Sequence, residues 1–410
     1  MPKKPNIYLD YSATTPVDPI VLKAMSPFFS KKFANPSSLY KKGLNSREAL
    51  EISRLTIARA INAEAGEIIF TSSATESNNF ALKGVALARQ SLGDGGFAHL
   101  PTPLRGFGMA SKNRGKHIII SAIEHDCVLA SAAWLQKQGF ELTIINPEKT
   151  GIIDPQKIKS ALRPDTILVS VMAVNNEIGT IQPISEIGKI CRSANIYFHT
   201  DAAQAFGKIP LDVRAMNIDL LTLSSHKIYG PKGVGCLFIR KSVKIEPTMH
   251  GGGQEFHLRS GTVNVAGVVG FAKAVEIATT TMNDEQQRIF GLANKLITGI
   301  KSAINNVELN ADAQNKVPNI LNLQFSFIEG ESLLMMLDIN GIQVSTGSAC
   351  SSEKLKPSHV LMAIGLLPEQ AHGSVRFSIG RLTTEQDIDR VLEILPKVVA
   401  DLRKISPLKN

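Results

Sequence analysis

The sequence feature that most constrains the fold is an alternation of short apolar runs and helical patterns between about residues 66 and 240. Seven runs are predicted strands: 68–70, 117–121, 142–146, 166–173, 197–200, 220–224 and 234–240. Helical patterns occupy 77–89, 128–138, 154–161 and 184–193. Alternation of this kind predicts βαβ units, and nearly all-apolar runs are typical of strands covered on both faces. The fold class is therefore α/β with a mostly parallel, seven-stranded sheet, whose ligands are expected at the carboxyl ends of the strands.

The pattern changes after about residue 264. The sequence there predicts helices over 265–278 and 285–304, a strand over 320–327 and a helix over 331–337. A closing amphipathic helix over 384–404 begins with a Thr-x-x-Asp cap and is interrupted by Pro396. Since 410 residues are enough for two domains, we expect a large domain over 16–263. Residues 1–15 and 264–410 are expected to form a smaller α+β domain.

Residues 91–114 interrupt the alternating region with a segment that lacks periodicity. The segment contains five glycines and two prolines between a predicted helix and the next predicted strand. Connections this long are unusual inside a compact sheet domain. We interpret it as a surface insertion that the fold tolerates.

Composition excludes several classes of protein. With 43% hydrophobic and 20% charged residues the chain is not disordered. Four cysteines with no CxxC spacing exclude a disulfide scaffold and argue against a metal site, and they suit a reducing cytoplasm. No run of 18 apolar residues predicts a membrane span. The chain has a net charge of +9, but its sequence contains no run of five basic residues, so we expect no direct nucleic-acid binding.

Polar residues follow several of the predicted strands. A hydroxyl-rich turn that includes Ala74 and Thr75 opens a helix and suits an anion, although an ordinary helix cap explains it equally well. His125 follows the next strand and could exchange protons or stack on a ring, or be a structural histidine. Asp201 ends another strand, with Gln204 three residues later, and a buried carboxylate there needs a cationic or protonated partner.

Lys227 has the most informative setting of these residues. It stands between the strand at 220–224 and a Gly-Pro turn, in the segment Ser224-Ser225-His226-Lys227. Burial and nearby positive charge would lower the pKa of such a lysine enough for its amine to attack a carbonyl. An anion cradle, a paired aspartate, a stacking histidine and a Schiff-base lysine are together what pyridoxal 5'-phosphate requires. The sequence therefore predicts a site for this cofactor.

Two further residues lie in the predicted small domain. Cys350 stands in a loop of about 344–357, where glycine and small residues surround it rather than the apolar neighbours usual for a structural cysteine. Arg376 lies within an apolar strand-like run and needs an anionic partner, which a substrate carboxylate would supply. We interpret Cys350 as a functional thiol on a mobile loop. Cys191 and Cys236 read as packing residues, and Cys127 is assigned no role.

Several ordered motifs give the chain a close resemblance to a known family. They are Tyr-Leu-Asp-Tyr-Ser-Ala-Thr-Thr-Pro at 8–16, Asn-Asn-Glu-Ile-Gly at 175–179, His-Gly-Gly-Gly at 250–253, Arg-Ser-Gly-Thr at 259–262 and Ser-Thr-Gly-Ser-Ala-Cys-Ser-Ser at 345–352. The chain resembles, nearly end to end, the NifS/IscS family of cysteine desulfurases. These are pyridoxal-phosphate enzymes of fold type I.

The resemblance implies a role for each matched residue. Lys227 would bind the cofactor aldehyde and move protons, Asp201 would pair with the pyridine nitrogen, and Gln204 would bond the ring hydroxyl. His125 would stack on the ring. The phosphate would be held by Ala74, Thr75, Ser224 and His226, and Thr262 would reach the phosphate of a second subunit, which implies a homodimer. Asn176 and Arg376, with Asn35 nearby, would bind the carboxylate of L-cysteine.

The implied reaction converts L-cysteine to L-alanine through a persulfide on Cys350. The sulfur would pass to an iron–sulfur scaffold or another acceptor protein, with tRNA thiolation left open as a second outlet. A selenocysteine lyase, or another fold type I enzyme acting on an amino acid, is the alternative. A non-catalytic partner-binding relative is a third reading, which the presence of Lys227, Asp201, His125 and Cys350 argues against.

Overall fold

The computed structural model describes residues 6–91, 115–347 and 356–407. The expected insertion at 91–114 therefore falls almost wholly outside the described residues, as does Cys350 with most of its loop.

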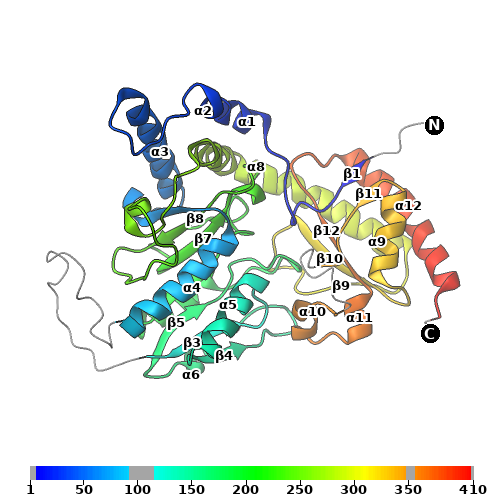
Figure 1. Ribbon diagram of the computed structural model, residues 1–410. Coiled ribbons are helices and arrows are strands. Elements are labelled where there is room, and N and C mark those ends of the chain that lie inside the picture. Colours follow the sequence, from blue (N-terminus) through cyan, green and yellow to red (C-terminus); the bar gives the residue numbers. More distant parts are fainter. Residues whose placement is uncertain (1–5, 92–114, 348–355, 408–410) are drawn as a thin grey trace.

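A seven-stranded sheet forms the centre of the larger part of the molecule (Figure 1). Its order is β2 (Ile68–Thr71), β8 (Gly235–Ile239), β7 (Leu220–Ser224), β6 (Tyr197–Asp201), β5 (Thr166–Ser170), β3 (His117–Ser121) and β4 (Glu141–Ile145). Only β8 runs antiparallel to its neighbours in this sheet. The predicted α/β class and mostly parallel sheet are confirmed.

Helices cover both faces of the sheet, and the strand residues alternate between two cores. Ile118 and Ile120 of β3 pack with α4 (Ala74–Ser91) and α5 (Asp126–Lys137). Ile119, between them, joins the opposite core, to which α3 (Lys41–Ala60), α6 (Pro155–Ala161) and α7 (Ile184–Ser193) contribute. Successive side chains of a strand point to opposite faces, so a strand covered on both must be apolar throughout.

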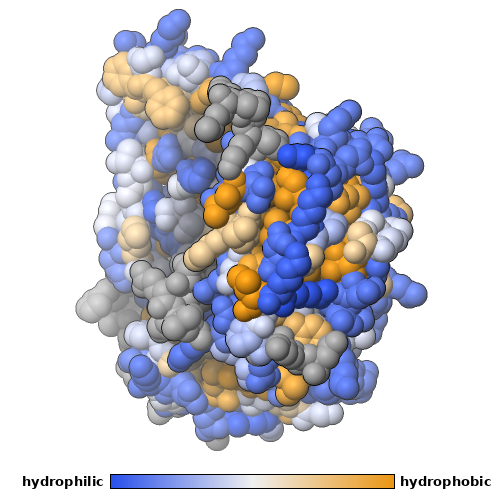
Figure 2. All heavy atoms as spheres, turned by 90° about the vertical axis from the view of Figure 1, so that its right-hand side faces the viewer, coloured by the Kyte–Doolittle hydropathy of each residue, from blue (hydrophilic) through white to orange (hydrophobic). Residues whose placement is uncertain are grey.

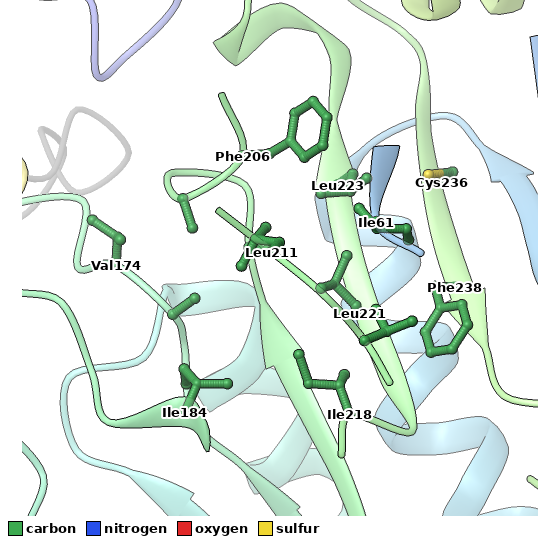
Figure 3. Packing of buried hydrophobic residues seen from close by; sticks show 14 of the residues in the cluster. Ile61, Val174, Ile184, Phe206, Leu211, Ile218, Leu221, Leu223, Cys236 and Phe238 are labelled. Atoms are coloured by element: carbon green, nitrogen blue, oxygen red, sulfur yellow. The ribbon is translucent and has the colours of Figure 1, made fainter. Parts of the chain in front are cut away.

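Figure 3 shows part of this second core. Leu221 and Leu223 of β7 lie close to Cys236 and Phe238 of β8, and all four side chains are fully buried. Cys191 in α7 is also fully buried. Cys191 and Cys236 are therefore packing residues, as the sequence predicted.

A second, smaller sheet lies at the other side of the molecule. β10 (Ile320–Phe325) pairs antiparallel with both β12 (Ser374–Ser378) and β9 (Val307–Leu309). α9 (Gly330–Ile339) and α12 (Glu385–Ile405) pack on it, and β1 (Ile7–Tyr8) pairs with β11 (Ile342–Gln343) nearby. Short helices complete the fold: α1 (Pro19–Met25), α2 (Pro27–Ser30), α10 (His359–Ala363) and α11 (Pro368–His372). Hydrophilic side chains predominate on the outer face of this part, with smaller hydrophobic patches between them (Figure 2).

One long helix, α8 (Val265–Ala303), is built into both parts. Phe271 and Val275 pack in the core of the large sheet, whereas Leu292 and Leu296 pack in the core of the small one. By length and composition the helix could cross a membrane, but 56% of its most apolar 18-residue stretch is buried inside the protein. It is accordingly a core helix shared by the two sheets.

Two predictions about helix ends were wrong. The expected break between residues 278 and 285 does not exist, because α8 is buried in the core of the large sheet on one side of it and in the core of the small sheet on the other. The hydroxyls of Thr279, Thr280 and Thr281 bond to carbonyls one turn earlier within the helix. Pro396 does not interrupt α12 either. The helix continues past it because Leu395 and Val399 are buried against the small sheet, which outweighs one lost backbone hydrogen bond.

Candidate active site

A cavity of about 240 Å³ opens at the carboxyl ends of the parallel strands. Residues that follow β2, β3, β5, β6 and β7 line it, together with the N-terminal segment and β12. The predicted site residues among its lining are Ala74, Thr75, His125, Asn176, Asp201, Gln204, Ser224, His226, Lys227 and Arg376. Segments far apart in the sequence thus meet where the fold class predicts a ligand.

Lys227 ends a short 3₁₀ turn that follows β7 directly. Its Nζ donates hydrogen bonds to the carbonyl oxygens of Ser12, at 2.5 Å, and Ala13, at 2.8 Å. The N-terminal segment therefore closes one side of the cavity and holds the amine at its wall.

The carboxylate of Asp201 is fixed from two sides at the end of β6. Oδ2 accepts a hydrogen bond of 2.6 Å from Nδ2 of Asn78, and Oδ1 accepts one of 2.9 Å from the backbone N–H of Ala203. Both Asp201 and Asn78 are buried. Sequence reasoning missed Asn78, although its place three residues after Thr75 on a helix sets both on the same side.

Gln204 lies one turn beyond Asp201 and is held by two contacts. Its Nε2 donates to the carbonyl of Ser12 at 2.8 Å, and its Oε1 accepts from Nζ of Lys208 at 2.6 Å. Burial, followed by the positive charges of Lys227 and Arg376, lowers the pKa of Lys208 to about 7. The side-chain amide of Gln204 therefore has a defined orientation at the cavity wall.

Part of the cavity wall offers hydrogen-bond donors to an anion. α4 begins at Ala74, so its first backbone N–H groups face this end of the cavity. The Ser224 hydroxyl is buried and has no hydrogen-bond partner in the described part of the chain. Nδ1 of His226 lies 3.0 Å from the hydroxyl of Thr14, and burial, followed by Lys227, lowers the pKa of His226 to about 4. This donor set suits a phosphate group.

His125 caps α5 at the end of the β3 segment. Its Nδ1 accepts a hydrogen bond of 3.2 Å from the backbone N–H of Cys127. Below it, Glu124 is fully buried and accepts from the Ser121 hydroxyl and from the backbone N–H of Met172. Burial raises the pKa of Glu124 to about 8.

Arg376 brings the small sheet to the cavity. From β12, its Nη1 donates to the backbone carbonyl of Asn176 at 2.9 Å and its Nη2 to Oδ1 of Asp10 at 2.7 Å. The Nε–H is buried and, within the described ranges, has no acceptor. An anion in the cavity would supply the missing acceptor.

Two predicted residues that the structure describes do not line the cavity of this chain, and a third lies outside the described residues. Asn35 is exposed, and its side chain accepts a hydrogen bond from the backbone N–H of Ser37. Thr262 is also exposed. Cys350 lies outside the described residues, but Gly347, three residues before it, lines the cavity. The roles of all three stay predictions.

Comparison with known proteins agrees with this geometry. The model of the aminotransferase class-V family matches residues 7–96 and 104–391. The cysteine desulfurase IscS of Dictyoglomus turgidum is 48% identical over 407 residues, which cover 99% of this chain and 98% of the relative. The chain belongs to the aminotransferase class-V family, among the cysteine desulfurases of NifS/IscS type.

Other relatives place the chain in the same part of this family. The cysteine desulfurase IscS of Methanosarcina thermophila is 48% identical, covering 98% of this chain and 94% of the relative. A solved NifS-like protein superposes with a TM-score of 0.86 at 34% identity, covering 97% of this chain and all of that one. A structure of SspA in complex with cysteine has a TM-score of 0.77 at 36% identity, covering 91% and 98%. Class-V cysteine desulfurases depend on pyridoxal 5'-phosphate, and the donor set of the cavity fits that cofactor.

Proposed function

We propose that this chain removes the sulfur of L-cysteine, releases L-alanine and carries the sulfur as a persulfide on Cys350. The observation that carries the proposal is the meeting of Lys227, Asp201 and Arg376 on one cavity of about 240 Å³. These are an amine, a carboxylate and a guanidinium, the three groups that a pyridoxal-phosphate enzyme with an amino-acid substrate would use, and they line the same cavity.

The cofactor would be held by groups already in place. Ser224, His226 and the first turn of α4 would hold its phosphate, Asp201 would keep the ring nitrogen protonated, and Lys227 would capture its aldehyde. Once bound, the cofactor withdraws electrons from the Cα of the substrate. Asn78 would help to orient the Asp201 carboxylate for this contact, because one of its amide protons donates to Oδ2.

The substrate carboxylate would accept a hydrogen bond from the Nε–H of Arg376, which has no acceptor among the described residues. Lys227 would take the proton from the substrate Cα, and His125, which lines the same cavity, would exchange a second proton. Orientation by Arg376 sets the distance between the substrate Cα and Lys227, which is the main requirement for this proton transfer.

The sulfur step needs a thiolate that can reach the cavity. The thiolate of Cys350 attacks the substrate sulfur, so that an S–S bond forms and the Cβ–S bond breaks. The products are the persulfide of Cys350 and, after proton uptake, alanine, and no external oxidant or reductant is consumed. Gly347 lines the cavity, and three residues of chain span at most about 11 Å. Chain length therefore permits Cys350 to reach the substrate sulfur, as the proposed step requires.

Two subunits would complete the enzyme. Several large apolar side chains of α1 to α3 and the segment between them are more than half exposed, among them Phe29, Phe33, Leu39 and Tyr40. Exposed apolar side chains gathered on neighbouring elements are typical of an interface, and Thr262 would reach the phosphate bound by the second subunit. The partners in the cytoplasm would be an iron–sulfur scaffold or another protein that accepts the persulfide sulfur.

The test is turnover of L-cysteine by the purified protein. We expect equimolar alanine and, with a reductant, sulfide, together with a mass increase of one sulfur on the Cys350 peptide. Cys350→Ala should lose sulfide release, with Cys191→Ala as the control. Full desulfuration of cysteine by Cys350→Ala would refute the persulfide route, and activity on selenocysteine alone would favour a selenocysteine lyase. Borohydride reduction should attach the cofactor to Lys227.

A further inference from the structure

Cys127 is a buried thiol at the wall of the active-site cavity that the proposed reaction does not use. It is the second residue of α5, only 9% exposed, and it lines the cavity between His125 and the end of β6. It belongs to an apolar core cluster, but its Sγ also lies within hydrogen-bond distance of His125 and Asn78. Cys236, by contrast, packs among apolar side chains (Figure 3). The polar contacts of Cys127 therefore call for an explanation in addition to packing.

The thiol of Cys127 contacts the imidazole of His125. Sγ lies 3.0 Å from Nδ1, and the backbone N–H of Cys127 donates to the same Nδ1 at 3.2 Å. Because the backbone N–H of Cys127 donates to Nδ1, Nδ1 is the unprotonated nitrogen of the His125 ring. The thiol must therefore be the donor in the contact between Sγ and Nδ1. The pKa of Cys127 is raised to about 12, mainly by burial and next by the negative charge of Asp201. The S–H proton is therefore present to be donated.

Asn78 links this thiol to the cofactor carboxylate. Its Nδ2 donates to Sγ of Cys127 at 3.1 Å and to Oδ2 of Asp201 at 2.6 Å. The reverse orientation of the amide would place its oxygen against the carboxylate, so Nδ2 is the atom that faces Asp201. Sγ thus accepts a hydrogen bond from Asn78 and donates one to His125, and the side chain of Thr75 also contacts it. A continuous chain therefore runs from Asp201 through Asn78 and Cys127 to His125.

We propose that Cys127 is a positioning residue, whose S–H is a second donor to Nδ1 beside its own backbone N–H, strengthens the tautomer of His125 with its proton on Nε2 and fixes the ring beside the cofactor. The inference rests on the proposed function, since it concerns the proton that His125 exchanges. A second consequence is that Cys127 does not carry sulfur, because a buried thiol that stays protonated and hydrogen-bonded is a poor nucleophile.

The test compares Cys127→Ala, which loses the donor, with Cys127→Ser, which keeps a hydroxyl donor in its place. Cys236→Ala is the matched control, since it removes an equally buried thiol away from the cavity. Each holoenzyme is assayed for kcat and KM with L-cysteine. A ¹H–¹⁵N spectrum of histidine-labelled holoenzyme, with the His125 signals assigned by their loss in His125→Gln, reports which ring nitrogen carries the proton.

The expected result is a kcat about fivefold lower in Cys127→Ala, as loss of one hydrogen bond predicts, with KM within twofold. The Nδ1 signal should move away from the position of an unprotonated nitrogen. Cys127→Ser should restore both, and Cys236→Ala should change neither. Wild-type kcat and an unmoved Nδ1 signal in Cys127→Ala would overturn the proposal, as would a serine variant no better than alanine, or a persulfide on Cys127 after turnover. If wild-type protein releases no alanine from cysteine, the proposed function fails, whereas the nitrogen spectrum still decides the role of Cys127.

Discussion

Arg376 and Asp10 form an ion pair of 2.7 Å that joins β12 to the segment following β1 at the rim of the active-site cavity. Both side chains are largely withdrawn from solvent. The pair orients the guanidinium and leaves its Nε–H for a ligand. Asp10 was not predicted from the sequence, because nothing local marks it as the partner of a residue 366 positions away.

Replacing Arg376 by lysine should therefore weaken substrate binding. We expect Arg376→Lys to lower kcat/KM for L-cysteine about 100-fold, mainly through KM, because an ammonium cannot reproduce the planar donors of a guanidinium. Steady-state kinetics with alanine detection checks this. Arg288→Lys is the control, since Arg288 bonds backbone carbonyls outside this cavity. An unchanged KM in Arg376→Lys would remove this residue from the substrate site.

Replacing Asn78 should loosen the cofactor. Asn78→Leu removes the amide that donates to Asp201, and we expect the cofactor Kd to rise about tenfold. Titration of cofactor-free protein, followed by visible absorbance, measures it. Asn79→Leu changes the neighbouring amide, which bonds only the Thr75 carbonyl of its own helix, and should bind the cofactor like wild type. Equal affinities of the two variants would contradict the assigned role of Asn78.

Stability should fall on acidification because of His199. The ring is fully buried between the hydroxyls of Ser170, at 2.8 Å, and Thr222, at 3.2 Å, and burial lowers its pKa to about 3. An unfolded histidine binds its proton near pH 6.5, so between about pH 6.5 and 3 the unfolded state holds more protons and stability drops as the pH falls. At pH 5 the loss from this group is about 2 kcal/mol.

Urea unfolding of holoenzyme at pH 7.5 and pH 5 measures this loss. His199→Gln keeps polar contacts to both hydroxyls but does not titrate, so its stability should depend less on pH. His372→Gln, at an exposed position, serves as the control. The same dependence in His199→Gln and wild type would show that other groups cause the acid sensitivity.

A buried ion pair should be critical for the segment that leads to Thr262. Arg54 donates from Nη1 and Nη2 to the two carboxylate oxygens of Glu255, at 2.7 and 2.8 Å, and the backbone N–H of Phe70 donates to Oε2 at 2.8 Å. Glu255, Phe256 and His257 all have positive φ, at 46°, 58° and 64°. This pair holds a backbone conformation that non-glycine residues rarely adopt.

Glu255→Leu would leave the Arg54 charge buried without this partner, and we expect a loss of about 3–5 kcal/mol in the free energy of unfolding. Urea denaturation measures it. Glu64→Leu, which removes an exposed pair with Lys241, should change stability little. The double variant Arg54→Leu/Glu255→Leu should recover part of the loss. A Glu255→Leu protein as stable as wild type would show that the pair is dispensable.

The sequence predicted the sheet and most of the cavity because both follow from local patterns. The strands are apolar on both faces, and Asp201, Ser224 and Lys227 stand directly at or after strand ends. The contacts of the N-terminal segment could not be predicted from such local patterns. Ser12 and Ala13 reach Lys227 only through the tertiary fold, and Asn78 was hidden because an asparagine inside a helix carries no local signal.

The errors came from judging elements in isolation. Two helices were predicted over 265–278 and 285–304, yet one helix continues through because its two ends are buried in different cores. Cys127 could be given no role from sequence, because its meaning lies in the distances to His125 and Asn78.

Because α8 is shared between the two cores, residues cannot be inserted into or deleted from its middle without disturbing one of them. One residue inserted near its middle would turn everything beyond it by about 100° and advance it about 1.5 Å. Leu292 and Leu296 would then leave the small core, or the small sheet would swing and carry Arg376 away from Lys227. The length of the middle of this helix thus sets the distance between the groups that would bind the substrate carboxylate and the catalytic amine. In this part of the helix, natural variants should differ in the identity of residues but not in their number.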